Sequence, residues 1–511
     1  MSKVLLTQAG ITIEDVINVA QNGYALELSD ELKHNIEESR KVVDSYVADE
    51  KIVYGITTGF GKFSDVFIGK QDTGTLQRNL IISHACGVGN PLPEHIVRAI
   101  MMLRLNALSR GLSGIRLETV EQLLELINKQ VHPVIPEKGS LGASGDLAPL
   151  SHMVLTMLGL GEAFYKGKRM PSEKALELAG LKPIELSSKE GLALINGTQV
   201  MTAVGCFAVH QAEMLAKQSD INLALSMEAL EGISDAFDKR IHEARGQIGQ
   251  IATADNLLRI IEGSESITRQ GEKRVQDAYA LRCSAQVIGA SKDAIDYVKQ
   301  KVEIEINAVT DNPLIFKEDD SVISGGNFHG QPIALPMDFL AIAIAELANI
   351  SERRLERLVN PALSNGLPAF LSKDGGLNSG FMIVQYSAAA LVSENKVLAH
   401  PASVDSIPSS ANQEDHVSMG TIAARKAYEI AENAKNVLAM ELMGACQGID
   451  LRGIKVLGKG SRVAYDVVRK RISFVEKDRV MYTDINRYAA ILDSRELIEK
   501  VENAVGEIKL K

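Results

Sequence analysis

The tripeptide Ala143-Ser144-Gly145 lies within the stretch GSLGASGDLAPLSH, which begins at Gly139. Glycine has no side chain, so the backbone nitrogen of Gly145 can approach a nearby carbonyl group closely. Attack of that nitrogen on the Ala143 carbonyl would close a five-membered ring. Loss of two water molecules, one of them from Ser144, would then leave an exocyclic methylidene group. The tripeptide can therefore become an electrophile built from the chain itself.

The same stretch also has an ordinary structural interpretation. Asp146 follows the tripeptide and belongs to the residue types that cap the amino termini of helices. In that case the glycines only shape the turn that leads into a helix. Spacing alone leaves both the turn and the electrophile open.

Seven blocks of the sequence together resemble the aromatic amino acid ammonia-lyases and aminomutases. In chain order the blocks are VYGITTGFG, SHACGVG, GASGDLAPLSH, GLALINGTQ, VQDAYALRC, ISGGNFHG and SSANQEDHVSMG. In that family Ala-Ser-Gly forms the methylidene-imidazolone (MIO) electrophile, and no external cofactor is needed. The resemblance covers essentially the whole chain and is greatest to the histidine-specific ammonia-lyases. It implies conversion of L-histidine to trans-urocanate and ammonia, the first step of histidine degradation.

The resemblance assigns roles to residues that would otherwise be unremarkable. Tyr54 lies on a glycine-rich loop and matches the family's catalytic tyrosine, so it is the expected base for the β-proton of the substrate. Asn196 precedes a glycine, which usually indicates a turn, but by resemblance its amide hydrogen-bonds near the MIO carbonyl. Phe328 matches an aromatic residue beside the MIO group, and Gln413 is expected to contact substrate.

In the block VQDAYALRC, Gln276, Tyr279 and Arg282 fall at intervals of three residues. If the segment is helical, all three face one side. Arginine suits bidentate binding of a carboxylate, although an amphipathic helix with a surface arginine has the same pattern. The resemblance implies the substrate site, with Tyr279 at the MIO group and Arg282 on the carboxylate.

Substrate choice is expected to depend on Glu414 and His84. The electrophile would make the amine of an α-amino acid a better leaving group, and a base would remove the weakly acidic β-proton beside an aromatic ring. A carboxylate at Glu414 can accept a hydrogen bond from imidazole, whereas a phenyl ring would leave it unpaired. Met382 also matches the histidine enzymes. Glu414 is also a second candidate for the group that transfers the proton. Its ordinary structural interpretation is an acidic residue at the start of a helix.

Two other classes of function remain open from the sequence. The first is a tyrosine or phenylalanine ammonia-lyase, or an aminomutase that returns the amine to the β-carbon. The second is a helical scaffold or storage protein with an inactive site. Product analysis and an intact-mass deficit of two water molecules distinguish them.

Composition narrows the partners of the chain. The 511 residues carry a net charge of −10, which offers no basic surplus for nucleic acid. The amino terminus lacks a secretory pattern, and the apolar segment 337–350 contains two acids and is shorter than a membrane span. The four cysteines are scattered, which favours free thiols and a cytoplasmic location. No histidine spacing indicates a metal site.

The elements that must position these residues are mostly helices. Apolar residues recur at three- and four-residue intervals in six segments, 97–108, 120–127, 201–230, 340–358, 387–400 and 422–446. A short hairpin is expected from the apolar runs of segment 313–324.

We therefore expect a mainly α fold. The resemblance implies a fumarase/aspartase-like long-helix bundle with an N-terminal MIO-bearing domain. The expected division is residues 1–200, which carry the Ala-Ser-Gly and Tyr54 loops, and residues 201–511, which form the central and C-terminal helices. The resemblance also implies a homotetramer whose active sites are shared between subunits.

Overall fold

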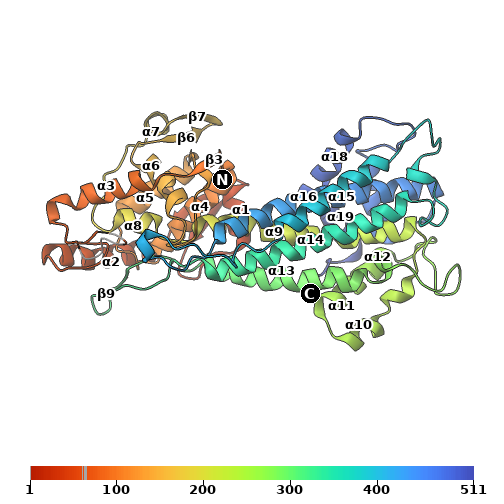
Figure 1. The fold of residues 1–511 in the computed structure, drawn as a ribbon, viewed down its shortest axis with the longest axis horizontal. Coiled ribbons are helices and arrows are strands. Elements are labelled where there is room, and N and C mark those ends of the chain that lie inside the picture. Colours follow the sequence, from red (N-terminus) through yellow and green to blue (C-terminus); the bar gives the residue numbers. More distant parts are fainter. Residues whose placement is uncertain (1, 60, 62–65) are drawn as a thin grey trace. The chain divides into compact units, whose positions relative to one another are not determined.

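The computed structural model describes residues 2–59, 61 and 66–511. These residues form mostly α-helices, several of them long, with short strands in four small sheets (Figure 1). The prediction of a mainly α-helical chain built from long helices is confirmed.

The described residues group into two compact units, each assembled from three chain segments. The first unit holds Met1–Phe207, Gln300–Asp338 and Pro401–Arg425, and the second holds Ala208–Lys299, Phe339–His400 and Lys426–Lys511. The expected division had a single boundary at residue 200, whereas two later segments pack with the amino-terminal one. Periodicity shows local structure but not which distant segments pack together, so the sequence did not indicate this.

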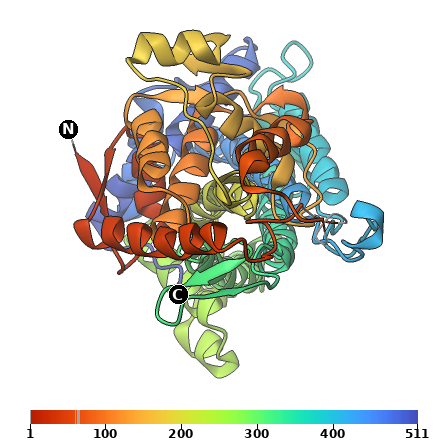
Figure 2. The ribbon, with the colours of Figure 1, turned by 90° about the vertical axis from the view of Figure 1, so that its left-hand side faces the viewer.

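The first unit combines helices with small sheets, and Figure 2 shows its red and orange amino-terminal helices facing the viewer. Its helices are α1 (Ile13–Ala20), α2 (Asp30–Ala48), η2 (Lys70–Asp72), α3 (Thr73–His84), α4 (Glu94–Ser109), α5 (Leu117–Asn128), α6 (Leu147–Met157), α7 (Ser172–Ala179), α8 (Glu190–Ile195) and η5 (Ser410–Asn412). Its strands are β1 (Lys3–Leu6), β2 (Ala25–Leu28), β3 (Val88–Pro91), β4 (Val131–Pro133), β5 (Pro136–Lys138), β6 (Glu162–Tyr165), β7 (Lys168–Pro171), β8 (Leu314–Phe316) and β9 (Ser321–Ile323).

The sheets of the first unit are local. Strands β1 and β2 pair in parallel, β3 pairs with β5, and β4, β6 and β7 form an antiparallel sheet. The predicted hairpin is confirmed, because β8 and β9 pair antiparallel with Leu314 opposite Ile323. Helix α4 is buried on nearly every side, which makes it the core helix of this unit.

Four helices have residues in both units; the first, third and fourth of them confirm predicted periodic segments, whereas the second was not predicted. They are α9 (Gln199–Ala229), α13 (Ser284–Glu305), α14 (Gln331–Val359) and α16 (Gly420–Arg452). The helices and turns confined to the second unit are η3 (Ser234–Phe237), α10 (Lys239–Arg245), α11 (Ile248–Ile260), α12 (Tyr279–Arg282), η4 (Ala369–Leu371), α15 (Met382–Leu398), α17 (Lys459–Arg469), α18 (Met481–Asp493) and α19 (Glu496–Val505).

Within the second unit, buried polar contacts join the long helices. The Glu441 carboxylate of α16 accepts hydrogen bonds from Ser226 of α9 at 2.8 Å and from Ser351 of α14 at 2.6 Å, and it pairs with Arg354. All four side chains are buried. A buried carboxylate requires such partners, so the network specifies how these helix segments pack.

Two helical stretches among the described residues are long and apolar enough to cross a membrane by length and composition. They are the run Glu190–Ala229 and helix α14. The segment 337–350 lies within α14, which extends over 29 residues, so the expectation that this segment is too short to span a membrane was wrong. Their apolar windows are 100% and 67% buried within the structure. Burial of this kind is the pattern of a core helix.

Candidate active site

A cavity of about 1080 Å³ in the first unit gathers side chains from widely separated segments. It has the size and mixed polar and apolar lining of a small-molecule site. Seven of the predicted site residues line it, namely Tyr54, His84, Ser144, Asn196, Phe328, Gln413 and Glu414. Ala143 and Gly145 line a smaller adjacent cavity that shares Ser144, His84 and Glu414 with it. The tripeptide therefore forms part of the wall of both cavities.

The Ser144 residue is held at two atoms. Its carbonyl oxygen accepts a hydrogen bond from Asn196 Nδ2 at 3.0 Å, and its hydroxyl donates to Glu414 Oε1 at 3.1 Å. The contact with Glu414 joins residues 270 positions apart in the chain. An amide donor on the carbonyl and a carboxylate on the hydroxyl both act on Ser144, the residue whose loss of water would give the methylidene group.

Gly145 is in the left-handed region of the backbone, with φ of +72°. A Cβ atom at this position would lie 2.3 Å from the carbonyl oxygen of Gly197, and the next backbone nitrogen, that of Asp146, donates to the same oxygen at 2.8 Å. Only glycine permits this conformation together with so close a backbone approach. The residues present therefore fit an MIO group, which needs a position without a side chain next to a serine with a polarised carbonyl.

Gly145→Ala is expected to block dehydration of the tripeptide and to destabilise the fold by about 1–3 kcal/mol through backbone strain alone. Intact mass should then equal the sequence mass, and turnover should be lost. Gly167→Ala is the matched control, because Gly167 also has φ of +72° but nothing lies within 4 Å of a Cβ there. A dehydrated, active Gly145→Ala protein would contradict the assignment.

Asp146 is a functional candidate that the sequence analysis considered only as a possible helix cap. It directly precedes α6, but its side chain makes no cap to that helix. Instead Oδ2 accepts from the backbone nitrogens of Val200 and Met201, each at 2.9 Å, while Oδ1 accepts from the hydroxyls of Ser140 (2.8 Å) and Thr421. Burial raises the pKa of Asp146, and these hydrogen bonds lower it. The carboxylate thus ties the tripeptide loop to the start of α9.

Glu414 is presented by a closed loop rather than by a helix. Backbone hydrogen bonds connect Ser409 and Glu414 in both directions, at 2.9 and 3.3 Å, and Ser409 Oγ donates to Glu414 Oε2 at 3.2 Å. Helix α16 begins only at Gly420, so the alternative that Glu414 starts a helix was wrong. Glu414 is the one acidic side chain among the described residues that line the larger cavity.

Burial shifts the titration of two cavity residues. Burial lowers the pKa of His84 at the end of α3. The Leu80 carbonyl and the Glu414 charge raise this pKa, but burial has the larger effect. It raises the pKa of Tyr54, and the Glu414 charge adds to that increase, while the Gly61 N–H that donates to the phenol oxygen at 3.4 Å lowers it. The Tyr54 phenol is therefore biased toward its protonated form. Phe60 and residues 62–65 of the adjoining loop lie outside the described residues.

Four predicted residues belong to the second unit and do not line the cavity: Gln276, Tyr279, Arg282 and Met382. Helix α12 begins at Tyr279, so the conditional prediction of one helical face from Gln276 to Arg282 was wrong. The backbone at Ala278 is extended, and the carboxylate of its neighbour Asp277 accepts from Ile233 N at 2.6 Å, which holds Gln276 outside the helix.

Tyr279 and Arg282 nevertheless lie together. The Arg282 guanidinium carbon is 4.4 Å from the centroid of the Tyr279 ring, and its Nε donates to the Asp277 carbonyl at 2.8 Å. The Tyr279 side chain is 69% exposed in this chain. An aromatic ring and a cation are thus presented side by side, with the ring open to a partner.

The side chains that commonly bind metals do not form a metal site in the described part of the chain. No three His, Cys, Asp or Glu side chains gather there as a metal ion would require. All four cysteines are free, and Cys86 is exposed beside the smaller cavity. Asn79 and Asn312 also line the larger cavity, although no motif had singled them out.

Comparison with known proteins shows the family of this chain. The family model described as aromatic amino acid lyase matches residues 11–470. A histidine ammonia-lyase from Alkaliphilus oremlandii is 66% identical over 505 residues, which cover 99% of each chain. The solved structure of histidine ammonia-lyase from Trypanosoma cruzi has a TM-score of 0.92 at 44% identity, covering 98% of this chain and 96% of that one. Tyrosine aminomutase from Streptomyces globisporus has a TM-score of 0.95 at 37% identity, with full coverage of both.

The chain therefore belongs to the aromatic amino acid lyase family. Within that family, the relative of 66% identity is a histidine ammonia-lyase. The family and the lyase class expected from the seven sequence blocks are confirmed, as is the fold that the resemblance implied.

Proposed function

We propose that the protein is a histidine ammonia-lyase that converts L-histidine to trans-urocanate and ammonia. The observation that carries this proposal is the contact of Glu414 with Ser144, in a cavity with no other acid among its described lining residues. A carboxylate there can pair with an imidazole N–H beside the reacting centre, whereas the ring of phenylalanine offers it no partner. The histidine ammonia-lyases found among the relatives support the same substrate.

We infer that Ala143, Ser144 and Gly145 condense into the internal MIO group and that no external cofactor is needed. When formed, this group supplies an electrophile that turns the substrate amine into a better leaving group. Asn196 would donate to the carbonyl of the group, and Gly197 and Asp146 would hold the loop in the left-handed conformation described for Gly145.

Tyr54 is our assigned base, because its phenol reaches the cavity from a loop and can carry a proton. In this step Tyr54 takes the β-proton, the carbon–nitrogen bond breaks, and the α,β-unsaturated acid remains. Glu414 would orient the imidazole ring and is the rival for proton transfer. His84 and Phe328 would bound the ring, and Gln413 would add a polar contact.

The activity is expected to rise with pH through the alkaline range, because the pKa of Tyr54 is raised and only the phenolate can act as a base. Tyr54→Phe should lose turnover at every pH. Glu414→Gln removes a negative charge that raises this pKa, so it should move the rising limb of kcat/KM toward lower pH. A pH–rate profile checks this, and a rate that stays constant with pH over the same range would favour a carboxylate base, and so Glu414, over Tyr54.

The substrate carboxylate needs a cation that the cavity wall does not supply, since no Arg or Lys is among its described lining residues. We propose that Arg282 provides it, accompanied by Tyr279, Gln276 and Met382, from another copy of the chain in a homotetramer. The 69% exposure of Tyr279 in the single chain supports this arrangement. The four free cysteines support a cytoplasmic enzyme.

Shared sites predict complementation between inactive variants. Ser144→Ala and Arg282→Ala should each be inactive when produced alone. Produced together, they should form mixed tetramers in which some sites combine an intact Ser144 with an intact Arg282, and part of the activity should return. The two separately purified homotetramers, mixed without exchange of subunits, are the control and should stay inactive. No recovery in verified mixed tetramers would place both residues in one chain.

The proposal is tested by incubating the purified protein separately with L-histidine, L-tyrosine and L-phenylalanine while following the ultraviolet absorbance of each conjugated acid. Urocanate from histidine alone is the expected result. Coumarate or cinnamate would keep the electrophile but overturn Glu414 as the specificity residue. A β-amino acid product would indicate an aminomutase, the activity named for the structural relative from Streptomyces globisporus. A protein without product and without the mass deficit would be the inactive scaffold.

A further inference from the structure

We propose that Gln77 is a positioning residue: its side-chain amide fixes helix α8, and through α8 the Asn196 amide, against the cavity wall that carries His84. This inference rests on the proposed function, because it concerns the donor that holds the Ser144 carbonyl. Gln77 is fully buried and does not line either cavity described above. It therefore acts through other residues.

Gln77 caps the start of α8 from a different helix. The residue before α8, Lys189, has φ of +72° and makes no side-chain cap. Gln77 Oε1 instead accepts hydrogen bonds from the backbone nitrogens of Gly191, at 2.8 Å, and Leu192, at 3.3 Å. These N–H groups have no partner within the helix, so the amide oxygen supplies what a local cap would.

The two helices approach each other closely at this point. A Cβ atom on Gly191 would lie 2.8 Å from Gln77 Oε1 and 3.2 Å from its Cα. Only the absence of a side chain at Gly191 allows the contact. A small displacement of the Gln77 side chain is thus transmitted directly to the backbone of α8.

From Gln77 a continuous series of hydrogen bonds reaches the tripeptide. Leu192 donates its N–H to Gln77, its carbonyl accepts from the backbone nitrogen of Asn196 at 3.0 Å, and Asn196 Nδ2 donates to the Ser144 carbonyl at 3.0 Å. The helix between these contacts has only six residues. So short a helix has little internal stability of its own, so its ends must be held from outside.

The other end of the connection is the histidine side of the cavity. Gln77 and His84 are seven residues apart on α3 and therefore face the same side of the helix. Leu80, Ser83 and His84 of α3 line the cavity. One buried amide therefore sets the distance between the wall that would bound the substrate ring and the donor that would polarise the electrophile.

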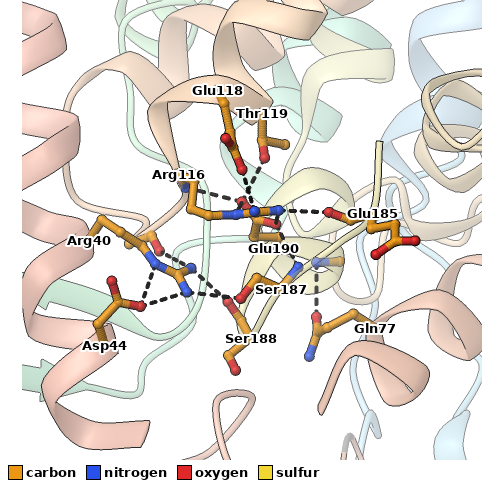
Figure 3. A network of polar contacts seen from close by, with 12 residues as sticks. Arg40, Asp44, Gln77, Arg116, Glu118, Thr119, Glu185, Ser187, Ser188 and Glu190 are labelled. Carbon is orange, nitrogen blue, oxygen red and sulfur yellow. Dashed lines mark hydrogen bonds and ion pairs between the residues drawn. The ribbon is translucent and has the colours of Figure 1, made fainter. Parts of the chain in front are cut away.

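A second set of contacts anchors α8 independently, as Figure 3 shows. The buried Glu190 carboxylate accepts hydrogen bonds from Arg116 Nε at 3.0 Å, Thr119 Oγ1 at 2.7 Å and the Ser187 backbone nitrogen at 2.7 Å. With this network in place, loss of Gln77 should leave α8 formed but free to shift. The effect of Gln77 can therefore be measured in a folded protein.

The chemistry of the side chain allows a rescue test. Gln77 Nε2 has no hydrogen-bond partner in the described structure, so only the oxygen is in use. Gln77→Glu keeps an acceptor at that position, and a carboxylate is compatible with the amino terminus of a helix. Gln77→Leu removes the acceptor and keeps the approximate volume. Gln447→Leu is the matched control, because buried Gln447 makes two hydrogen bonds to Val475 in the second unit.

Four proteins are compared: wild type, Gln77→Leu, Gln77→Glu and Gln447→Leu. For each, kcat and KM with L-histidine are measured together with hydrogen exchange of the peptide covering residues 190–197 and the dehydrated fraction from intact mass. For Gln77→Leu we expect kcat per dehydrated site to fall about tenfold to a hundredfold, since small displacements in an active site have effects of this size. KM should change less than about threefold, and exchange in 190–197 should accelerate.

Gln77→Glu should stay near wild type in both measurements, and Gln447→Leu should lose thermal stability without loss of kcat. The proposal is overturned if Gln77→Leu keeps wild-type kcat and exchange. It is also overturned if Gln77→Glu behaves as Gln77→Leu, or if exchange accelerates throughout the first unit. Failure of the proposed function would appear differently, as wild-type protein that makes no urocanate, and the exchange comparison would still test Gln77.

Discussion

Ser144→Ala is expected to abolish turnover of L-histidine, with kcat reduced by about 10³-fold or more, because the variant cannot form the electrophile. The fold should survive. The Ser144 hydroxyl makes one described hydrogen bond, to Glu414, and that carboxylate keeps its contact with Ser409 Oγ at 3.2 Å. Loss of a single hydrogen bond at a partly exposed position costs about 1 kcal/mol. Activity and stability should therefore separate clearly in this variant.

Intact mass, kcat and thermal unfolding together check the Ser144 prediction. Wild type should be lighter than its sequence by two water molecules, and Ser144→Ala should have its full sequence mass. Ser151→Ala is the control, since the Ser151 hydroxyl donates to the Leu147 carbonyl within α6 and Ser151 is not among the described residues that line the cavity. That variant should be dehydrated and active. Retained turnover in Ser144→Ala would remove the MIO assignment altogether.

Glu414→Gln and Glu414→Ala are expected to lower kcat/KM for L-histidine by about 10²-fold or more, because the imidazole N–H loses its charged hydrogen-bond partner. Any measurable turnover of L-tyrosine should fall much less, by under about tenfold, because a phenol ring does not need the same carboxylate. The asymmetry follows from the position of Glu414 beside Ser144, as the one acid among the described lining residues.

The Glu414 test compares two substrates, and a general loss of stability would lower both rates equally. It would therefore not produce the expected difference between histidine and tyrosine. Asp415→Asn removes a charge of the same sign at the next position, and Asp415 does not line the cavity, so both rates should stay near wild type. Equal losses on histidine and tyrosine in Glu414→Gln would show that Glu414 serves the common chemistry rather than the choice of substrate. A histidine rate that does not change would exclude both roles.

Local features of this chain could be read from the sequence. The periodic apolar segments became α4, α5, α9, α14, α15 and α16, and the run around residues 313–324 became the β8–β9 hairpin. Helical period and turn residues act over a few positions, so they are encoded locally. The family was also identifiable, because seven short blocks in a fixed order carry far more information than Ala-Ser-Gly alone.

The conformation of the site was decided by tertiary structure. Asp146 is of a residue type that often caps helices, but its carboxylate instead accepts hydrogen bonds from the backbone of Val200 and Met201 and from the hydroxyl of Thr421. Gln276 has helical spacing to Tyr279, but the Asp277 contact to Ile233 keeps it outside α12. In each case a partner that is distant in the chain outweighs a local preference, which contributes about 0.5–2 kcal/mol for a helix cap and a fraction of a kcal/mol for helix propensity.

The sequence by itself indicated the candidate tripeptide and determined the helical class and the family of this protein. Only the tertiary structure determined that Glu414 Oε1 lies 3.1 Å from Ser144 Oγ, that Asn196 donates to the Ser144 carbonyl, and that Gln77 accepts a hydrogen bond from the helix before Asn196. The physical reason is that residue type and local spacing specify which chemistry a side chain can perform. Packing of segments from distant parts of the chain specifies which of those side chains meet.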